Sequence, residues 1–366
     1  MQKTAASPKI LLCVLNWGLG HATRCIPLIR ELQKQGAAVT LASDGRAAEL
    51  LRKEFPALSV YELPAYRISY RTANMFVNIA PQLPKIAGAV RRERKAVARI
   101  LQKEKFDCII SDNRYGCYSS AVPSIFMTHQ LRIKMPFAWL ENAVLLFNQY
   151  FIKKFTECWV PDSAGKPNLS AALGHGDFSF PVLYLGVLSR MRPLQRPKKY
   201  DYLVVLSGPE PQRRYLEEIM LKQTIASEKK TLIVQGKTEE KKHYLPQKNV
   251  EVISFMTSAD LNEAAAAADL LICRSGYSTI MDLAAMRKKA VLIPTPGQTE
   301  QEYLAKNLHS QGIFYTASQS DFNLEYASRQ SKNYTGFTEN YADGEELRRA
   351  VGNLLSRLSG GTKDVP

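Results

Sequence analysis

The sequence lacks several features that would assign it to a membrane-spanning or secreted class. No apolar stretch approaches the roughly 18 to 20 residues that a membrane-spanning helix needs. The N-terminal segment, Met1 to Pro8, is short and polar, so we expect no signal peptide. The six cysteines are scattered without a C-x-x-C spacing, which argues against a disulfide framework or a metal knuckle. These absences predict a protein of the reducing cytoplasm.

The composition is that of a folded globular chain. Of its 366 residues, 45% are hydrophobic and 23% are charged, which excludes a disordered chain. At roughly 150 residues per domain, this length suggests two domains or one large one.

Positive charge is in excess and is unevenly distributed. The chain carries 49 basic and 34 acidic residues, a net charge of +15. Residues 1–185 hold 24 basic and 13 acidic residues, a net +11, and the remainder holds 25 and 21, a net +4. Such a surface suits nucleic acid, an anionic membrane face or an acidic ligand. No nucleic-acid recognition motif accompanies the charge, so we keep a basic nucleic-acid-binding protein only as a remote alternative.

Strand and helix patterns alternate along the chain, and the alternation starts again after its midpoint. We expect strands at 10–15, 38–43, 107–111, 124–128, 202–206, 230–235, 250–254, 270–273 and 290–294. We expect helices at 23–35, 45–55, 212–223, 258–267, 277–286, 300–311 and 344–358. Strands that alternate with helices build parallel sheets covered on both faces. The fold class predicted is α/β, with two doubly wound, Rossmann-like domains facing each other across a cleft.

The domain boundaries follow from the same patterns. We expect an N-terminal domain over 1–188, a basic, proline-punctuated linker over 189–200 and a C-terminal domain over 201–342. A last helix at 343–358 would pack back on the N-terminal domain, and 359–366 would be a tail.

A glycine-containing loop follows the first predicted strand. Gly18 and Gly20 let the backbone approach a ligand, and the start of the next helix favours anions. A dinucleotide-binding fingerprint would need a third glycine where this chain has Thr23, which leaves Asp44 as a ribose-binding acid only in a weak alternative. His21 stands in this loop, and a free imidazole titrates near neutrality, so we take it as a candidate general base.

The corresponding loop of the second half contains Ser207 and Gly208. Its simplest interpretation is a strand-to-helix turn. As a phosphate cradle it would use Arg213 or Arg214 as the cation.

The strongest signal lies at two successive strand ends of the second half. The first holds small and hydroxyl residues that suit a diphosphate at a helix N-terminus, with a carboxylate about one turn further on for ribose hydroxyls. These are Ser275, Gly276, Ser278, Thr279 and Asp282. The second holds amides and a carboxylate that suit sugar hydroxyls: Gln298, Gln301 and Glu302.

The segment from about 250 to 308 resembles the C-terminal half of glycosyltransferase family 28, which includes the lipid II-forming UDP-N-acetylglucosamine transferases. The resemblance rests on the Arg274-Ser-Gly motif, on a carboxylate eight residues later at Asp282, and on Gln301 after a proline-rich strand end. Two positions differ, because the family has Glu at the first carboxylate and a second Gln where this chain has Glu302.

The resemblance carries further implications. Phe255 and Met256 lie at the positions whose backbone, in the family, recognises the edge of the uracil base. By resemblance, the fold is GT-B and a UDP-sugar binds mainly to the C-terminal domain. The first glycine loop also resembles the Gly-x-Gly-His-x-x-Arg loop of related UDP-sugar hydrolases.

No Asp-x-Asp occurs in the sequence, so we expect neither a metal nor any other cofactor, with the UDP-sugar as a substrate. The leaving diphosphate would then be stabilised by helix dipoles, backbone N–H groups and an arginine. We expect direct displacement with inversion, with His21 as the base and Asp112 as the reserve base or the group that orients His21. His129 is expected on the acceptor side. A UDP-sugar hydrolase or epimerase of the same fold remains the alternative.

The expected acceptor is a glycan of the envelope or a polysaccharide, free or lipid-linked. Residues 85–105 form a basic amphipathic segment with eight basic and two acidic residues, which is either a solvated helix face or a docking surface for anionic lipid. Residues 135–155 are apolar, and we favour a core helix over an acceptor-side surface. The expected location is the cytoplasm, with peripheral attachment to the inner membrane face as an extension.

Overall fold

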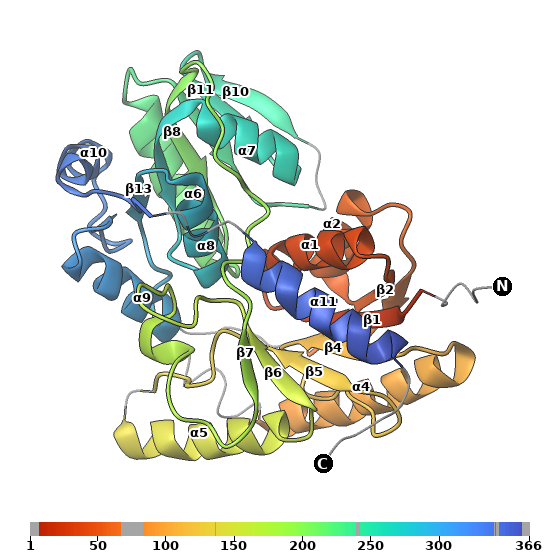
Figure 1. Cartoon of the computed structure of the whole chain (residues 1–366). Coiled ribbons are helices and arrows are strands. Elements are labelled where there is room, and N and C mark those ends of the chain that lie inside the picture. The colour runs from red at the N-terminus through yellow and green to blue at the C-terminus, as the bar shows by residue number, and fades with distance from the viewer. Residues whose placement is uncertain are drawn as a thin grey trace.

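The computed structural model describes residues 7–66, 83–135, 137–238, 242–339, 341 and 344–360. The predicted tail lies outside the described residues from residue 361 on, and so does residue 343, where the last predicted segment begins. Figure 1 shows two α/β domains, with the C-terminal helix of the chain lying against the first of them.

The N-terminal domain is built on a seven-stranded sheet of order β3-β2-β1-β4-β5-β6-β7, and every pairing in it is parallel. Its strands are β1 (Lys9–Val14), β2 (Ala38–Ser43), β3 (Val60–Glu62), β4 (Cys108–Asp112), β5 (Ser124–Met127), β6 (Glu157–Val160) and β7 (Val182–Tyr184). Its helices are α1 (Leu19–Lys34), α2 (Gly45–Glu54), α4 (Leu83–Lys103), α5 (Ala138–Ile152) and the short η2 (Ala171–Leu173). The strand order reverses beside β1, and ligands of doubly wound sheets bind at such a switch point.

The C-terminal domain repeats the plan with a sheet of order β10-β11-β9-β8-β12-β13-β14. Its strands are β8 (Tyr200–Val205), β9 (Thr231–Val234), β10 (His243–Gln247), β11 (Val250–Ile253), β12 (Ala268–Cys273), β13 (Ala290–Leu292) and β14 (Tyr315–Thr316). Its helices are α6 (Gln212–Ile225), α7 (Ser258–Ala266), α8 (Tyr277–Met286), α9 (Thr299–Ser310), α10 (Leu324–Gln330) and the short η3 (Ser331–Asn333). The edge strand β10 pairs antiparallel with β11, and the other pairings are parallel. The predicted fold class is confirmed.

The central strands form for the reason that their sequences indicate. In β1 every residue after Lys9 is fully buried, since helices cover both faces of a parallel sheet. The helix that follows differs from the prediction: α1 begins at Leu19, with Gly18 before it at φ 96°, so that His21 lies in the first helical turn rather than in a loop. A glycine in the first turn, Gly20, weakens the helix pattern that a sequence presents.

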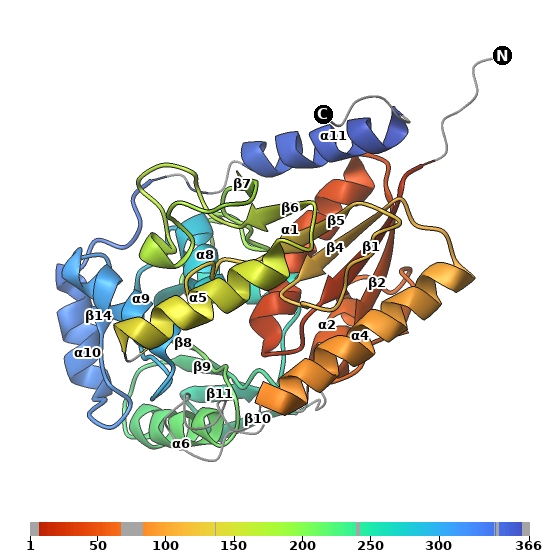
Figure 2. The same cartoon turned by 90° about the horizontal axis from the view of Figure 1, so that it is seen from below.

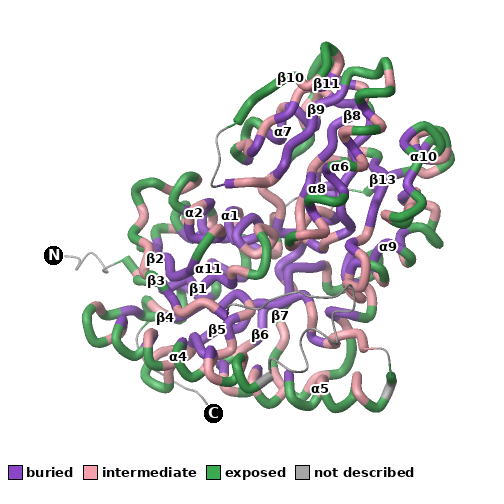
Figure 3. The backbone as a smooth tube through the Cα atoms, turned by 180° about the vertical axis from the view of Figure 1, so that it is seen from behind, coloured by how far each residue is buried: buried purple, intermediate pink, exposed green. Residues whose placement is uncertain are grey.

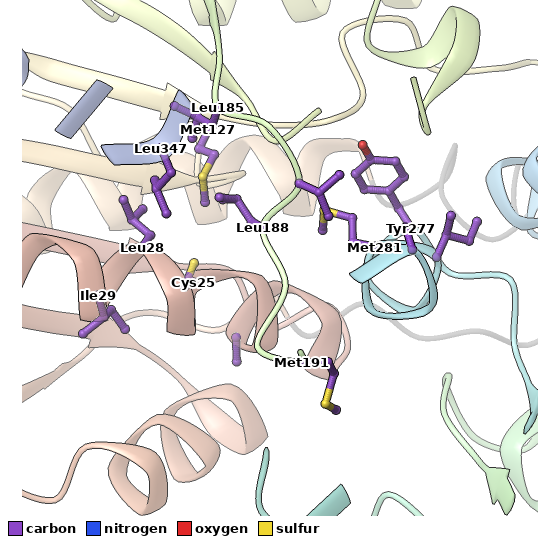
Figure 4. Packing of buried hydrophobic residues seen from close by; sticks show 14 of the residues in the cluster. Cys25, Leu28, Ile29, Met127, Leu185, Leu188, Met191, Tyr277, Met281 and Leu347 are labelled. Carbon is purple, nitrogen blue, oxygen red and sulfur yellow. The ribbon is translucent and has the colours of Figure 1, made fainter. Parts of the chain in front are cut away.

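One apolar core cluster runs from one domain into the other. The segment after β7 carries Leu188 and Met191, and both are buried in the same cluster as Cys25 of α1 and Met281 of α8. Figure 4 shows this segment passing between α1 and α8. The connection between the domains is therefore packed into the core.

The last helix, α11 (Glu345–Ser359), lies on the N-terminal domain beside α1. Gln35 donates a hydrogen bond from its side-chain amide to the carbonyl oxygen of Arg348 at 2.9 Å, and Arg357 pairs with Glu157 at 2.8 Å. Leu347, Val351 and Leu354 are buried beneath the helix.

The other face of the N-terminal sheet is covered by α4 and α5, which lie on one side of the molecule in Figures 1 and 2. Helix α4 buries Ala89, Val97 and Ile100 and leaves most of its basic side chains exposed. Helix α5 is different, because Trp139 is 70% exposed and Leu146 is 68% exposed. Our preferred interpretation of 135–155 as a core helix is therefore wrong for this face, which is apolar and turned outward, as the exposed tube in Figure 3 also shows.

Candidate active site

The predicted site residues of both domains meet where the two sheets present their carboxyl-terminal strand ends. Ser278 of α8 donates a hydrogen bond from its hydroxyl to the carbonyl oxygen of Gly20 in α1 at 2.8 Å. The rings of His129 and Tyr277 stack at a centroid distance of 4.3 Å, and the Tyr277 hydroxyl donates to the carbonyl oxygen of Pro161 at 2.7 Å. Because α1 and α8 both begin here, two helix N-termini, each with a partial positive charge, converge on one place.

His21 and Asp112 form a hydrogen-bonded pair at the centre of this contact. Nδ1 of His21 lies 2.8 Å from Oδ2 of Asp112, the last residue of β4. The Asp112 side chain is fully buried and that of His21 is 14% exposed, so one edge of the imidazole remains accessible. A carboxylate on Nδ1 leaves Nε2 as the basic nitrogen when Nδ1 carries the proton.

Burial lowers the pKa of His21 below that of a free imidazole, and the Arg24 guanidinium lowers it further, while Asp112 acts in the opposite direction. Burial alone would raise the pKa of Asp112, but Arg24 and His21 together hold it below its usual value. The pair is therefore an ionised carboxylate beside a neutral imidazole at neutral pH, which is the state that a general base requires.

Arg24 joins this pair to a second histidine. Its guanidinium donates from Nε to Oδ1 of Asp112 at 2.8 Å and from Nη1 to Nδ1 of His129 at 2.7 Å. Nε2 of His129 in turn lies 2.9 Å from Oε1 of Glu300, the second residue of α9 in the other domain. His129 thus lies between the two domains, where it joins the Arg24 cluster to helix α9 of the C-terminal domain.

The second glycine loop contributes a backbone turn. Gly208 has φ 101°, a conformation that favours glycine, and a Cβ atom there would lie 3.4 Å from the Thr295 hydroxyl. Ser207 precedes it, two residues after the end of β8. Arg213 is buried in ion pairs with Glu210 and with Glu217, which lies at 2.6 Å, so its cation is already paired within the domain. The exposed Arg214 lies 3.7 Å from Glu218. A phosphate-binding role for either arginine stays a prediction.

The Arg-Ser-Gly motif is used in large part to hold the site's loops together. Arg274 is fully buried and donates to the carbonyl oxygens of Pro294 at 3.1 Å and Gln212 at 2.9 Å. Burial lowers the pKa of Arg274 to about 10. Ser275 donates from its hydroxyl to the carbonyl oxygen of Gln301 at 2.9 Å.

Gly276 is the N-terminal cap of α8, so Ser278 and Thr279 lie in its first turn, as expected. Asp282 lies about one turn further on and contacts the linker, since Ser189 donates to its Oδ1 at 2.6 Å. Arg190 Nε lies 3.8 Å from its Oδ2. Burial raises the pKa of Asp282, against the opposing effect of Arg190.

The side chains after β13 are tied to their own loop. Oε1 of Gln301 accepts a hydrogen bond from the backbone N–H of Thr295 at 2.9 Å, and its amide nitrogen donates to Gln298. Oε1 of Glu302 accepts from the N–H of Gly297 at 2.8 Å. These bonds fix the loop that follows β13 at the mouth of the site.

Phe255 and Met256 lie between β11 and α7, where they are partly buried against the main core cluster. The Lys53 ammonium lies 5.1 Å from the centre of the Phe255 ring. Their part in reading a base stays a prediction.

Sequence reasoning missed four residues of this site: Arg24, Glu300, Ser189 and Arg190. Glu300 is 171 residues from its partner His129, and no local pattern links them. The composition around Ser189 and Arg190 indicates only a linker. Arg24 had a usable signal, since it stands three residues after His21 and so lies on the same face of a helix.

Among the described residues no group of three or more His, Cys, Asp or Glu side chains is arranged to hold a metal ion. No helix in the part of the chain that the structure describes is long and apolar enough to cross a membrane.

Comparison with known proteins agrees with the geometry. Residues 203–339 match the glycosyltransferase family 28 C-terminal domain. A UDP-N-acetylglucosamine--N-acetylmuramyl-(pentapeptide) pyrophosphoryl-undecaprenol N-acetylglucosamine transferase of Methylobacterium sp. (strain 4-46) is 26% identical, over 95% of this chain and 94% of its own length.

Among solved structures, the glycotransferase of kitacinnamycin superposes with a TM-score of 0.61 at 16% identity and covers 96% of this chain and 99% of its own. Acinetobacter baumannii MurG superposes with a TM-score of 0.55 at 16% identity, covering 97% of this chain and 99% of its own. The protein is therefore a glycosyltransferase of the GT-B fold. More particularly, it carries a family 28 C-terminal domain and is a distant homologue of the MurG-like transferases.

Proposed function

We propose that this chain transfers a hexose or N-acetylhexosamine from a UDP-sugar to an envelope or polysaccharide acceptor carried on a lipid, with inversion and without a metal. The observation that carries the proposal is the His21–Asp112 pair, 2.8 Å apart, in which His21 directly follows the residue, Gly20, that Ser278 of α8 contacts. UDP-N-acetylglucosamine is the first donor to test, because it is the donor named for the full-length relative.

In the proposed reaction, Nε2 of His21 accepts the proton of an acceptor hydroxyl. The acceptor oxygen then forms a bond to the anomeric carbon as the bond from that carbon to the β-phosphate oxygen breaks, and UDP leaves. Asp112 orients the imidazole and stabilises the imidazolium that forms. The converging N-termini of α1 and α8 support the developing charge of the diphosphate with backbone N–H groups and helix dipoles.

Donor binding is proposed for the C-terminal domain. Ser278 and Thr279 would contact the diphosphate, and the ribose would bind at Asp282. Gln298 and Gln301 would contact the sugar, with Glu302 as the residue that differs from the family pattern. The glycine turns at Gly18 and Gly208 leave backbone accessible beside these groups.

A lipid-linked acceptor is supported by the outward face of α5. Trp139, Leu146, Phe147 and Tyr150 are all exposed and recur at the spacing of one helix face. Helix α4, most of whose basic side chains are exposed, lies on the same side of the molecule. An apolar helix face beside cations suits the interface of an anionic membrane. We therefore propose peripheral attachment to the cytoplasmic membrane through this surface.

The test is a turnover assay of the purified chain. UDP, GDP and dTDP are first compared by thermal shift, where UDP should stabilise the protein most. UDP release is then measured from UDP-N-acetylglucosamine, UDP-N-acetylgalactosamine, UDP-glucose and UDP-galactose, with and without the relative's lipid-linked acceptor and with EDTA. We expect release that depends on the acceptor, an inverted linkage and no effect of EDTA. Equal release of free sugar without acceptor would identify a hydrolase instead, and conversion of the donor to its epimer would identify an epimerase.

A further inference from the structure

Arg24 is a buried cation that contacts more polar side chains than the single carboxylate of an ordinary ion pair. Its side chain is 2% exposed. It donates to Asp112 from two nitrogens and to His129 from a third, and its Nη2 lies 2.9 Å from Nδ1 of His21. The guanidinium therefore contacts the proposed base, its carboxylate and a second imidazole at once.

The two hydrogen bonds of His129 determine its tautomer and its charge. A guanidinium has only donors, so Nδ1 of His129 must accept the hydrogen bond from Arg24. The ring proton then resides on Nε2, which donates it to Oε1 of Glu300 at 2.9 Å. His129 is accordingly a neutral imidazole that links the Arg24 cation to the Glu300 carboxylate.

The hydrogen bonds of His21, by contrast, are compatible with either of its two neutral tautomers. Its Nδ1 can donate to Asp112 or accept from Arg24, but it cannot do both. The first tautomer leaves Nε2 free to take a proton, whereas the second places the proton on Nε2. Whatever holds Arg24 in place therefore influences whether His21 can act as a base.

We call the five side chains Arg24, His21, Asp112, His129 and Glu300 the cluster. Its charges cancel, with His21 protonated, only when Glu300 of the C-terminal domain is included. Asp112 and Glu300 are each negative, Arg24 is positive and His129 is neutral, so a proton on His21 brings the cluster to neutrality. Without Glu300 the protonated cluster would carry a net positive charge in a largely buried place, which is costly. Burial works against the Glu300 carboxylate, but His129 and its hydrogen bond more than offset this and lower the pKa of Glu300.

We infer that Glu300, His129 and Arg24 form a positioning relay by which the donor-binding domain completes the His21 base of the acceptor-side domain. The inference rests on the proposed role of His21. It predicts that His21 has the correct tautomer and its full basicity only while Glu300 lies against His129. Catalysis would thereby depend on contact between the two domains.

A purely structural role would give a different result. The Glu300 side chain is 27% exposed, and an ion contact of that kind contributes only about 1 kcal/mol or less to stability. The titratable and charged groups that act on His21 are Arg24 on its own helix, Asp112 of β4, His129 after β5 and, from the other domain, Glu300. Only Glu300 among these is both charged and supplied by the donor domain.

The experiment is histidine ¹⁵N NMR of the full chain, which reports the tautomer and the titration of each imidazole without any substrate. The chain has five histidines, and the His21 and His129 signals are assigned with single substitutions. The variants are Glu300→Gln, which keeps an acceptor for His129 but removes the charge, and Glu300→Ala, which removes both. Glu54→Ala is the matched control, since Glu54 accepts from the backbone N–H of Ser258 at 2.9 Å and so makes a different contact between the domains.

In the native protein, His129 should be the neutral Nε2–H tautomer and His21 the Nδ1–H tautomer. Both Glu300 variants should lower the pKa of His21, because a nearby negative charge is lost. Glu300→Ala should in addition mix the tautomers of His129 and His21. Glu54→Ala should match the native protein. An unchanged His21 titration in Glu300→Gln, or an equal shift in Glu54→Ala, would overturn the relay.

Rates then separate the relay from the proposed function. UDP release from UDP-N-acetylglucosamine in the presence of the lipid acceptor should fall about tenfold in Glu300→Ala and less in Glu300→Gln. A shifted His21 titration with a native rate in Glu300→Ala would remove the relay from catalysis. If His21→Ala retains native turnover, it is the assignment of the base that fails, and the NMR coupling is still measured independently.

Discussion

The hydroxyl of Ser278 donates to the carbonyl oxygen of Gly20 at 2.8 Å, and this bond joins the first turns of two helices from different domains. A Cβ atom on Gly20 would lie 3.0 Å from that hydroxyl oxygen, tighter than nearly all real contacts of this kind. Glycine at position 20 therefore favours close approach of the domains, because a methyl group there would have to displace the Ser278 hydroxyl by a few tenths of an ångström. The same approach brings the His21 imidazole toward the N-terminus of α8.

Gly20→Ala is expected to reduce kcat/KM about tenfold or more, because overpacking of this kind typically costs about 1–3 kcal/mol. The steric part of this loss can be separated with Ser278→Ala, which removes the oxygen that the new methyl group would meet. In that background Gly20→Ala should cost clearly less than in the native chain, as measured by a double-mutant cycle on UDP release. Equal costs in the two backgrounds would show that the Ser278 contact is not what requires the glycine.

His21→Ala tests the base directly. We expect kcat to fall about 100-fold or more, since general bases typically contribute factors of about 10²–10⁴. UDP affinity, measured by calorimetry, should stay within about twofold, because the imidazole contacts Asp112 and Arg24 rather than the donor-side loops. Native turnover in this variant would remove His21 from the mechanism.

Asp112→Asn tests how the base is held, and it has a pH signature. Burial and Arg24 lower the pKa of His21, whereas Asp112 raises it, so removal of the carboxylate should lower that pKa further. The rate falls as His21 becomes protonated, and the acid limb of the rate profile should therefore move to lower pH. The plateau rate should fall about 100-fold or more, because the imidazole loses the partner that selects its tautomer.

The same substitution affects stability, because Arg24 loses its buried counter-ion. Breaking a buried ion pair in this way typically costs about 3–5 kcal/mol. Since the folded pKa of Asp112 is lowered, its contribution to stability is present above the unfolded pKa and is lost as the pH falls through the folded value. Thermal unfolding of native protein and variant should therefore differ most near neutral pH and converge in acid, whereas a constant difference would contradict the ion-pair account.

Asp282 has two candidate roles that can be separated. Its Oδ1 accepts from Ser189 in the linker, yet a carboxylate has lone pairs enough to bind ribose hydroxyls as well. Asp282→Ala should weaken UDP binding about tenfold or more, as expected for hydrogen bonds to a charged group. Ser189→Ala removes only the linker contact and should change the UDP dissociation constant by less than about twofold. Equal effects of the two substitutions would assign Asp282 to the linker alone.

The parts of the fold that the sequence predicts well are those in which burial alone determines the pattern. The apolar run at 10–15 and its counterpart at 202–206 correspond to β1 and β8, which lie inside their sheets. The edge strand β10 gives no such pattern, since most of its side chains are exposed. The first turn of α1 was missed because Gly20 weakens the helix signal there.

The candidate site likewise contains residues that the sequence predicts and residues that it does not. His21, Asp112 and Ser278 could be singled out because Asp112 ends the recognisable strand β4, and the other two lie in the first turn of the helix that follows such a strand. Glu300 could not, since its partner His129 belongs to the other domain and the pairing exists only after folding. The prediction for helix α5 was wrong because an apolar helix face gives the same sequence pattern whether it packs against a core or lies exposed.

Helix α5 is expected to bind membranes through its exposed apolar face. Leu146 and Phe147 are 68% and 54% exposed, and Lys154 lies 4.4 Å from the centre of the neighbouring Tyr150 ring. If this surface enters the lipid interface, each large apolar side chain contributes about 1.5–3 kcal/mol. The double variant Leu146→Glu with Phe147→Glu should therefore reduce binding to vesicles that contain an anionic phospholipid by more than about tenfold, as measured by co-sedimentation.

Leu245→Glu is the matched control, since Leu245 is 66% exposed on β10 in the other domain, and it should bind as the native chain does. Binding of the native chain should weaken with added salt, because cations on α4 supply part of the attraction. Native binding by the α5 double variant would exclude this face as the attachment surface.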